Sequence, residues 1–153
     1  MLYQLSYLAA RGDGSGRFRP FPSCSLRFVS ELIHTCYRIF EIDRSVDFYS
    51  RLGFEELARM PIRDEAVNVF MGMPGDGARL ELTWNKDQGE PYEIGTGYGH
   101  IALAVEDLDG ALASLAESGI EPEKPPYSVR EGGSRLCFVR DPDGYRIELI
   151  EKA

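Results

Sequence analysis

The chain has 153 residues, of which 43% are hydrophobic and 27% charged, and its formal net charge is −8. These values are typical of one ordinary globular domain, or of two small fused half-domains, with a core of normal size. No apolar run approaches the roughly 18–20 residues of a membrane-spanning helix. A negative chain also disfavours nucleic acid, whose phosphates attract basic surfaces. We therefore expect neither a membrane nor a nucleic acid as partner.

The cysteine content indicates a reducing compartment. Three cysteines are present, an odd number, and no two of them have the CxxC spacing: Cys24, Cys36 and Cys137. This pattern disfavours both a disulfide framework and a zinc–cysteine site. We expect a cytoplasmic protein.

The first 32 residues differ in composition from the rest of the chain. Residues 1–30 carry a net charge of +3, which leaves −11 for residues 31–153. Glycine is dense at 12–16 and proline at 19–22, and both residues interrupt helices and strands. No period of 2 or 3.6 is sustained there. We expect residues 1–32 to be a disordered or non-native extension outside the fold. A targeting segment, or a later translation start such as Val29, is the alternative.

A series of elements begins at Ile33. A strand is predicted over 33–40, followed by a helix that Asp43 would cap and Gly53 would end. The apolar face of this helix consists of Val46, Phe48, Tyr49 and Leu52. Three strands follow, near 54–60, 66–71 and 78–84, and a Pro-Gly-Asp-Gly turn at 74–77 joins the last two.

The second half of the chain has the same order of elements. A strand at 98–105 leads to a helix that Asp107 would cap and Gly119 would end, with Leu108, Ala111, Leu112 and Leu115 inward. Strands are predicted near 123–129, 135–139 and 145–151, with an Asp-Pro-Asp-Gly turn at 141–144. The pattern predicts an α+β fold of two βαβββ modules. One domain over 33–153 would contain repeat 33–84, linker 85–97 and repeat 98–151.

Each repeat begins with a histidine and ends with a glutamate on its last strand. His34 and His100 are 66 residues apart, and Glu81 and Glu148 are 67 apart. A duplication of this kind governs the whole fold prediction. Because these are the chain's two histidines, the coincidence favours a shared role over four unrelated residues.

Strand alternation places these side chains on one kind of face. Glu81 and Glu148 each lie between two apolar residues that can be core, and His100 shares its face with two alanines that leave space. The four side chains would leave the helix-covered side and gather if the sheets curl. A lone histidine or glutamate is usually structural or solvated. Two of each form a mixed N/O ligand set suited to Zn, Ni, Co, Mn or Fe(II).

Four segments carry a resemblance to a known family. They are His34–Ser50, Leu80–Asn85, Gly95–Leu103 and Phe138–Leu149. These segments resemble glyoxalase I, the lactoylglutathione lyases, within the vicinal oxygen chelate superfamily. The resemblance covers roughly residues 31–153. It implies βαβββ modules whose curled mixed sheets form an open barrel around a metal.

The resemblance also implies a site and a reaction. The metal ligands would be His34, Glu81, His100 and Glu148, and in short members the site lies between two subunits of a homodimer. Nickel or cobalt would be favoured, with zinc as the alternative. The reaction would convert the methylglyoxal–glutathione hemithioacetal to S-D-lactoylglutathione through an enediolate. Glu148 would be the catalytic base, and Glu81 would serve the other substrate enantiomer or only hold the metal.

Three further residues match or lie near family positions that contact the thiol. Arg38 shares the face of His34, and a guanidinium suits a carboxylate. Asn85 ends a strand, and Arg130 lies just before two glycines, near a position where many members carry a lysine. The thiol would be glutathione or another small thiol.

Two other classes remain open at this point. One is a different metalloenzyme of the superfamily, such as an epimerase, a thiol transferase or a ring-cleaving dioxygenase. The other is a non-enzymatic binding module that has lost its metal. The four-residue ligand set favours glyoxalase I over both.

Overall fold

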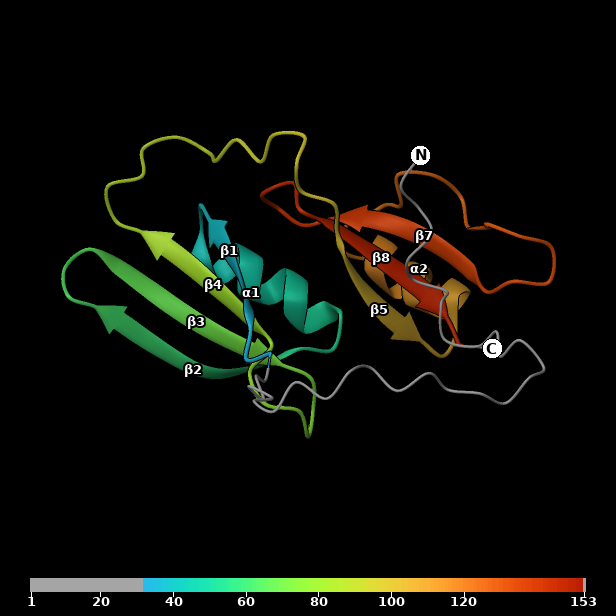
Figure 1. The fold of residues 1–153 in the computed structure, drawn as a ribbon, viewed down its shortest axis with the longest axis horizontal. Coiled ribbons are helices and arrows are strands. Elements are labelled where there is room, and N and C mark those ends of the chain that lie inside the picture. The colour runs from blue at the N-terminus through green and yellow to red at the C-terminus, as the bar shows by residue number, and fades with distance from the viewer. Residues whose placement is uncertain (1–31, 153) are drawn as a thin grey trace, which may run out of the picture. The chain divides into compact units, whose positions relative to one another are not determined.

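The computed structural model describes residues 32–152, and the expectation for residues 1–32 falls, apart from Leu32, outside the described residues. The first half contains β1 (Thr35–Ile39), α1 (Ile42–Arg51), β2 (Glu55–Ile62), β3 (Ala66–Gly72) and β4 (Leu80–Asn85). The second half contains β5 (Ile101–Val105), α2 (Leu108–Ala116), β6 (Tyr127–Ser128), β7 (Arg135–Arg140) and β8 (Arg146–Glu151) (Figure 1). Among residues 32–152, neither α1 nor α2 is long and apolar enough to cross a membrane.

Each half forms its own four-stranded mixed sheet. The strand orders are β1-β4-β3-β2 and β5-β8-β7-β6, so the two halves have the same topology. In each sheet the first strand runs parallel to the last, and the other pairs are antiparallel. The α+β class with two βαβββ modules is confirmed. The two sheets are separate and do not close into a barrel.

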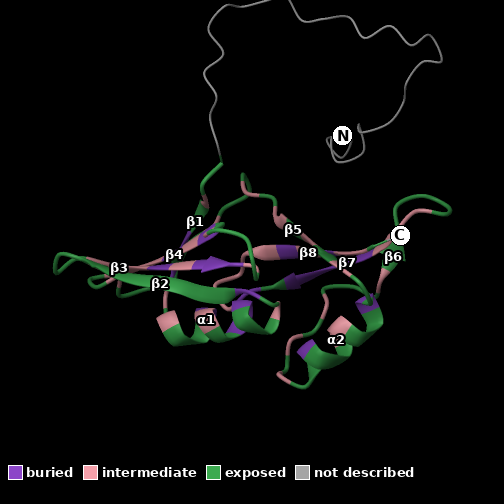
Figure 2. Ribbon diagram, turned by 90° about the horizontal axis from the view of Figure 1, so that it is seen from below, coloured by how far each residue is buried: buried purple, intermediate pink, exposed green. Residues whose placement is uncertain are grey.

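The core lies between the sheets and the two helices, which cover the same side of the sheets (Figure 2). In β1, β4 and β8 the buried residues alternate with exposed or half-buried ones, as the period of 2 predicts. The buried side chains of these three strands are Tyr37, Ile39, Leu80, Leu82, Ile147 and Leu149. The residues between them face away from the helices. The glutamates of β4 and β8 belong to this second set.

The start of α1 differs from the prediction. Its N-cap is Glu41, which makes no side-chain capping bond, and Asp43 lies in the first turn of the helix. The cause is a contact from the other half of the chain: Asp143 accepts hydrogen bonds from the Phe40 backbone N–H at 2.9 Å and from the Ser45 hydroxyl at 3.1 Å. The Asp107 cap of α2 is confirmed, since its carboxylate accepts from the Gly110 N–H at 3.0 Å.

Two predicted strands are shorter than expected. β6 has two residues instead of 123–129, because Pro125 and Pro126 have no N–H to donate to a ladder. β5 begins at Ile101, since Tyr98 packs edge-to-face against Tyr37 at 5.6 Å. In both halves the histidine therefore lies directly before its first strand.

The Asp-Pro-Asp-Gly turn at 141–144 joins the two halves. In addition to the bonds of Asp143, the Arg44 guanidinium donates to the Pro142 carbonyl at 3.0 Å. The Tyr49 hydroxyl donates to the Asp141 carboxylate at 2.8 Å, inside the core. Burial raises the pKa of Asp141 to about 6. The turn therefore fixes α1 against the last strands of the second half.

Candidate metal centre

The first candidate pair consists of His34 and Glu81. His34 directly precedes β1, and Glu81 lies in β4, where its Cα pairs with that of Cys36. The two side chains meet through His34 Nε2 and Glu81 Oε2, which are 3.0 Å apart. The imidazole is one-third exposed and the carboxylate is largely buried, so the imidazole is the more accessible member of the pair.

The second pair repeats this arrangement. His100 directly precedes β5, and Glu148 of β8 pairs in register with Ala102, two residues further along. His100 Nε2 and Glu148 Oε2 are again 3.0 Å apart, with similar exposure. The duplication seen in the sequence is therefore also a duplication of local geometry.

Each histidine also contacts a phenylalanine edge-to-face. The ring centroids are 5.7 Å apart for His34 and Phe70, and 5.2 Å apart for His100 and Phe138. Each phenylalanine lies directly opposite its glutamate on the neighbouring strand. The sequence reasoning did not single out these rings. The sequence does contain a signal for them, because Phe70 lies 11 residues before Glu81 and Phe138 lies 10 residues before Glu148.

The geometry of each pair fits two neighbouring ligands of one cation. Two atoms at about 2.1 Å from an ion and at right angles to each other lie about 3.0 Å apart. Nδ1 of His34 is buried and has no hydrogen-bond partner in the described part of the chain. The nitrogen available to an ion is therefore Nε2, which already faces the carboxylate.

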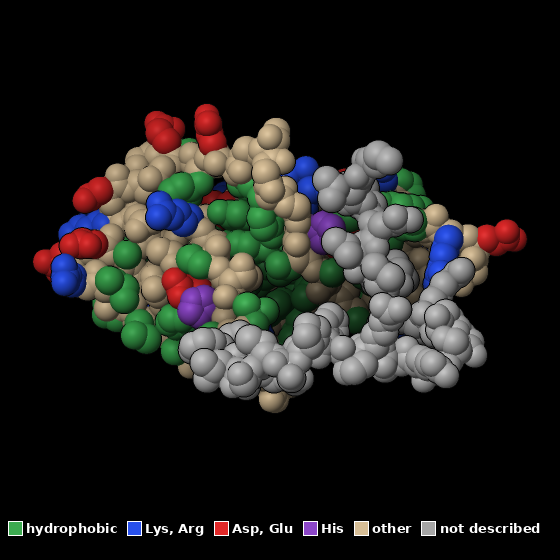
Figure 3. Space-filling view, in the orientation of Figure 1, with side chains coloured by type: hydrophobic (Ala, Val, Ile, Leu, Met, Phe, Trp, Pro, Cys, Tyr) green, Lys and Arg blue, Asp and Glu red, His purple; other side chains and the backbone are tan. Residues whose placement is uncertain are grey.

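The two pairs do not come together within one chain. Among residues 32–152, no group of three or more His, Cys, Asp and Glu side chains is placed to hold a metal ion. The two histidines, purple in Figure 3, lie apart on the same face. Each chain thus presents two separate pairs of ligands. The four-residue site stays a prediction, since each pair would need further ligands from another molecule.

The surroundings of the two glutamates differ. Glu81 Oε1 accepts hydrogen bonds from the Thr83 hydroxyl at 2.9 Å and from the Asn68 amide at 3.1 Å. In the second half, the matching strand positions are occupied by Ile150 and Leu136, which cannot donate. Among the described residues, His100 is the one hydrogen-bonding or ion-pair partner found for Glu148.

Two of the three predicted thiol-binding residues are brought together. Arg38 is exposed on β1, and Asn85 is the last residue of β4. Both contact Tyr92 of the linker: Asn85 Nδ2 donates to the Tyr92 hydroxyl at 2.7 Å, and Arg38 Cζ lies 6.0 Å from the Tyr92 ring centroid. Arg130 belongs to the other half, in the loop between β6 and β7. Sequence reasoning missed Tyr92.

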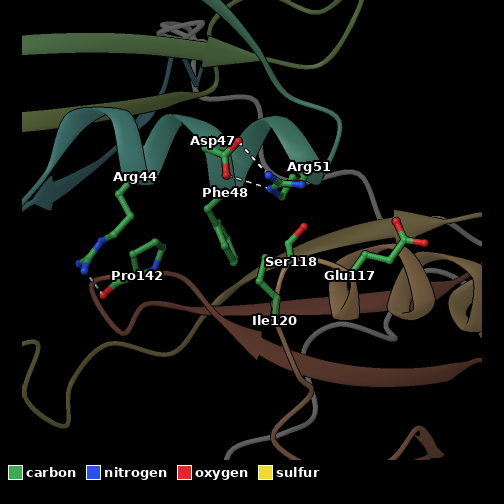
Figure 4. Close-up of a pocket in the computed structure, with 8 residues that line it drawn as sticks. All are labelled: Arg44, Asp47, Phe48, Arg51, Glu117, Ser118, Ile120 and Pro142. Carbon is green, nitrogen blue, oxygen red and sulfur yellow. Dashed lines mark hydrogen bonds and ion pairs between the residues drawn. The ribbon is translucent and has the colours of Figure 1, made fainter.

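A cavity of about 400 Å³ lies elsewhere, beside α1 on the helix-covered side (Figure 4). Its lining includes Phe48 and Ile120, and three of its charged side chains, Arg44, Asp47 and Arg51, already have partners. Arg51 pairs with Asp47 at 2.9 Å, and Arg44 donates to a backbone carbonyl. Because neither histidine–glutamate pair lines this cavity, it is not the candidate metal centre.

The sequence and fold were compared with known proteins. Residues 31–149 match the family model of the Glyoxalase/Bleomycin resistance protein/Dioxygenase superfamily. The chain belongs to this superfamily. Relatives within it include "Lactoylglutathione lyase GLX1" of Arabidopsis thaliana, 35% identical over 78% of this chain and 44% of the relative. Another is "Lactoylglutathione lyase" of Escherichia coli O157:H7, 37% identical over 79% of this chain and 92% of the relative.

Solved structures of the superfamily have the same fold. Glyoxalase I from Zea mays is 31% identical with a TM-score of 0.72, over 80% of this chain and 44% of that one. The trypanothione-dependent glyoxalase I of Leishmania major is 34% identical with a TM-score of 0.66, over 80% and 87%. The chain spans less than half the length of the plant relatives and nearly all of the bacterial one.

Proposed function

We propose that this protein is a metal-dependent glyoxalase I. It would isomerise the hemithioacetal of methylglyoxal and glutathione to S-D-lactoylglutathione. The observation that carries the proposal is the repeated histidine–glutamate pair, with 3.0 Å between ligand atoms in each half. The similarity to lactoylglutathione lyases of plants and bacteria supports it.

The complete site would form between two copies of the chain. His34 and Glu81 of one protomer would meet His100 and Glu148 of a second one. Two N and two O donors would then hold one divalent ion, with nickel or cobalt favoured and zinc as the alternative. The separation of the two pairs within a chain supports this arrangement, because neither pair alone is a complete ligand set.

A divalent ion held there would supply Lewis-acid stabilisation of the enediolate, whose two oxygens come from the neighbouring carbons of the substrate. The protein must then move one proton from C1 to C2. We assign this task to Glu148, whose carboxylate has one partner, His100, among the described residues.

Glu81 would have a different part. Its Oε1 already accepts two hydrogen bonds, which hold the carboxylate in one orientation. A carboxylate held in this way is suited to keep an ion in place. Glu81 would therefore act chiefly as a fixed ligand, with a proton-transfer role limited to the other substrate enantiomer.

The thiol part of the substrate would lie along β1 and β4. The Arg38 guanidinium offers a charge-assisted contact to a carboxylate, and Asn85 lies beside it. Arg130 would bind the other charged end of the thiol from the second half of the chain. Glutathione is the proposed thiol, and another small thiol with a free carboxylate would use the same contacts.

The test begins with protein stripped of metal by a chelator. Preformed methylglyoxal–glutathione hemithioacetal is added, thioester absorbance is followed, and Ni²⁺, Co²⁺ or Zn²⁺ is returned in parallel. We expect no turnover before metal is added and turnover afterwards, with the fastest rate for Ni²⁺ or Co²⁺. Stoichiometric binding of an ion without turnover for any of the three would overturn the proposed function.

A further inference from the structure

Tyr92 lies between two side chains that the proposed function assigns to the thiol. It is half-buried in the segment that links β4 to β5. Its hydroxyl accepts a hydrogen bond from Asn85 Nδ2 at 2.7 Å, and its ring faces the Arg38 guanidinium at 6.0 Å, the outer range of a cation–π contact. One aromatic residue thus contacts both.

Arg38 and Asn85 lie on the same face of their sheet as the first histidine–glutamate pair. Arg38 is in register with Thr83, and Glu81, Thr83 and Asn85 are alternate residues of β4. Asn85 therefore lies about 13 Å along the strand from Glu81, at roughly 3.3 Å per residue. An elongated ligand with one end at the pair would reach Arg38 and Asn85 with its other end.

The contacts of Tyr92 leave a defined set of free groups. Because Asn85 Nδ2 is turned to the hydroxyl, its Oδ1 remains an acceptor for a cationic donor. Within residues 32–152, no ion pair is found for the Arg38 guanidinium, which is open to an anion. An acceptor beside a guanidinium matches an α-amino acid group, which carries one ammonium and one carboxylate.

We propose that Tyr92 is a positioning residue that sets the specificity of the thiol site. Tyr92 fixes the Asn85 amide through a hydrogen bond and contacts the Arg38 guanidinium with its ring. In this way it makes the site select thiols that end in a free α-amino acid group, such as the γ-glutamyl end of glutathione. This proposal rests on the proposed function, since it concerns the thiol part of that substrate.

The test compares two hemithioacetals of methylglyoxal in wild-type protein and Tyr92→Phe. One is made from glutathione, and the other from N-acetylcysteinylglycine, which lacks the γ-glutamyl amino and carboxyl groups. The phenylalanine keeps the ring and removes the hydrogen-bond acceptor. Loss of one such bond corresponds to about a fivefold change. We expect KM for the glutathione substrate to rise about fivefold with kcat unchanged, and kcat/KM for the truncated substrate to stay the same.

A calorimetric titration with S-methylglutathione gives a readout that needs no turnover. The affinity is expected to fall by the same factor in Tyr92→Phe and to stay at the wild-type value in Tyr127→Phe, an exposed tyrosine on β6. If Tyr92 acts through Asn85, adding Tyr92→Phe to Asn85→Ala causes little further loss.

The outcomes separate the two proposals. An equal loss on both hemithioacetals, or additive losses in the double variant, would overturn the positioning role and leave Tyr92 as an anchor of the linker. If the wild-type protein turns over neither hemithioacetal, the proposed function fails. The S-methylglutathione titration then still decides the role of Tyr92, because unchanged affinity in Tyr92→Phe would refute it.

Discussion

The two halves of the chain place the same three side chains in the same relation but surround their glutamates differently. Both hold a histidine 3.0 Å from a glutamate and edge-to-face with a phenylalanine. In the first half, Thr83 and Asn68 donate to the carboxylate of Glu81. In the second half, apolar residues stand at the matching strand positions around Glu148. The two halves thus share the geometry of the histidine–glutamate pair, but the chemical environment of the glutamate differs between them.

This difference assigns separate parts to two residues of the same type. A carboxylate fixed by hydrogen bonds keeps its oxygens aimed at one point, which serves ion binding. A carboxylate with apolar neighbours and one polar partner has fewer bonds to break when it moves toward a substrate proton. The comparison thus leads from strand register to a division between a holding glutamate and a proton-transferring one.

The largest expected effect separates the two glutamates directly. Glu148→Gln removes the proposed base while it keeps the size of the side chain, and we expect kcat to fall by about 10²–10⁴-fold. Excess metal would not restore it. Glu81→Gln should chiefly weaken metal binding, so that added metal restores part of the activity. Steady-state kinetics over a metal titration distinguish the two variants. Rescue of Glu148→Gln by metal would reverse the assignment.

A smaller effect is expected from the groups that hold Glu81. Thr83→Val keeps the shape of the side chain and removes the hydroxyl that donates to Glu81. We expect the affinity for metal to fall about 10-fold to 100-fold. The matched control in the second half is Ile150→Val, which removes no hydrogen bond and should leave the affinity unchanged. Competition with a chromogenic chelator measures both. Equal affinities for Thr83→Val and the wild type would remove the distinction between the halves.

The turns before the last strand of each half also differ. This difference predicts the smallest effect, a pH dependence of the stability. Asp141 begins the second turn and is buried, whereas Pro74 at the matching place in the first turn is exposed. Burial raises the pKa of Asp141 from 3.8 to about 6. The folded state therefore binds the proton more tightly, and the stability that Asp141 contributes is fully present below pH 3.8 and is lost as the pH rises through about 6.

Asp141→Asn should remove this pH dependence. The amide oxygen can still accept from the backbone N–H groups of Asp143 and Tyr145, and the Tyr49 hydroxyl can rotate to accept from the amide. We expect the stability of the variant relative to the wild type to rise by up to about 3 kcal/mol between pH 4 and pH 7. Urea unfolding across this range measures it. Parallel pH profiles would show that Asp141 does not titrate in this window.

The repeated pattern of the sequence predicted most of the fold. The βαβββ order, the two sheets and the faces of β4 and β8 follow from local periodicity and from turn residues. The early start of α1 and the late start of β5 did not follow, because they depend on contacts between distant residues. Asp143 binds the start of α1 from about 100 residues away, and Tyr98 packs on Tyr37.

The candidate site could be predicted in part for the same reason. Residue types and spacing indicated the two histidines and two glutamates, and the structure joins them into pairs. The Asn68 donor to Glu81 was not predictable from spacing, since Asn68 reaches Glu81 across a strand pair whose register the sequence does not determine. Tyr92 was missed because the linker has no periodicity from which to infer a direction for its side chain.

Subunit mixing tests most directly the central claim that the two pairs become one site across two chains. His34→Ala and Glu148→Gln are each expected to be inactive, and a mixed dimer of the two would contain one intact site. After subunit exchange, random mixing predicts recovery to about a quarter of wild-type activity. Mixing His34→Ala with Glu81→Gln, which break the same half-site, should recover nothing beyond the separate variants. If neither mixture recovers activity although mass spectrometry shows mixed dimers, the claim of a shared site is contradicted.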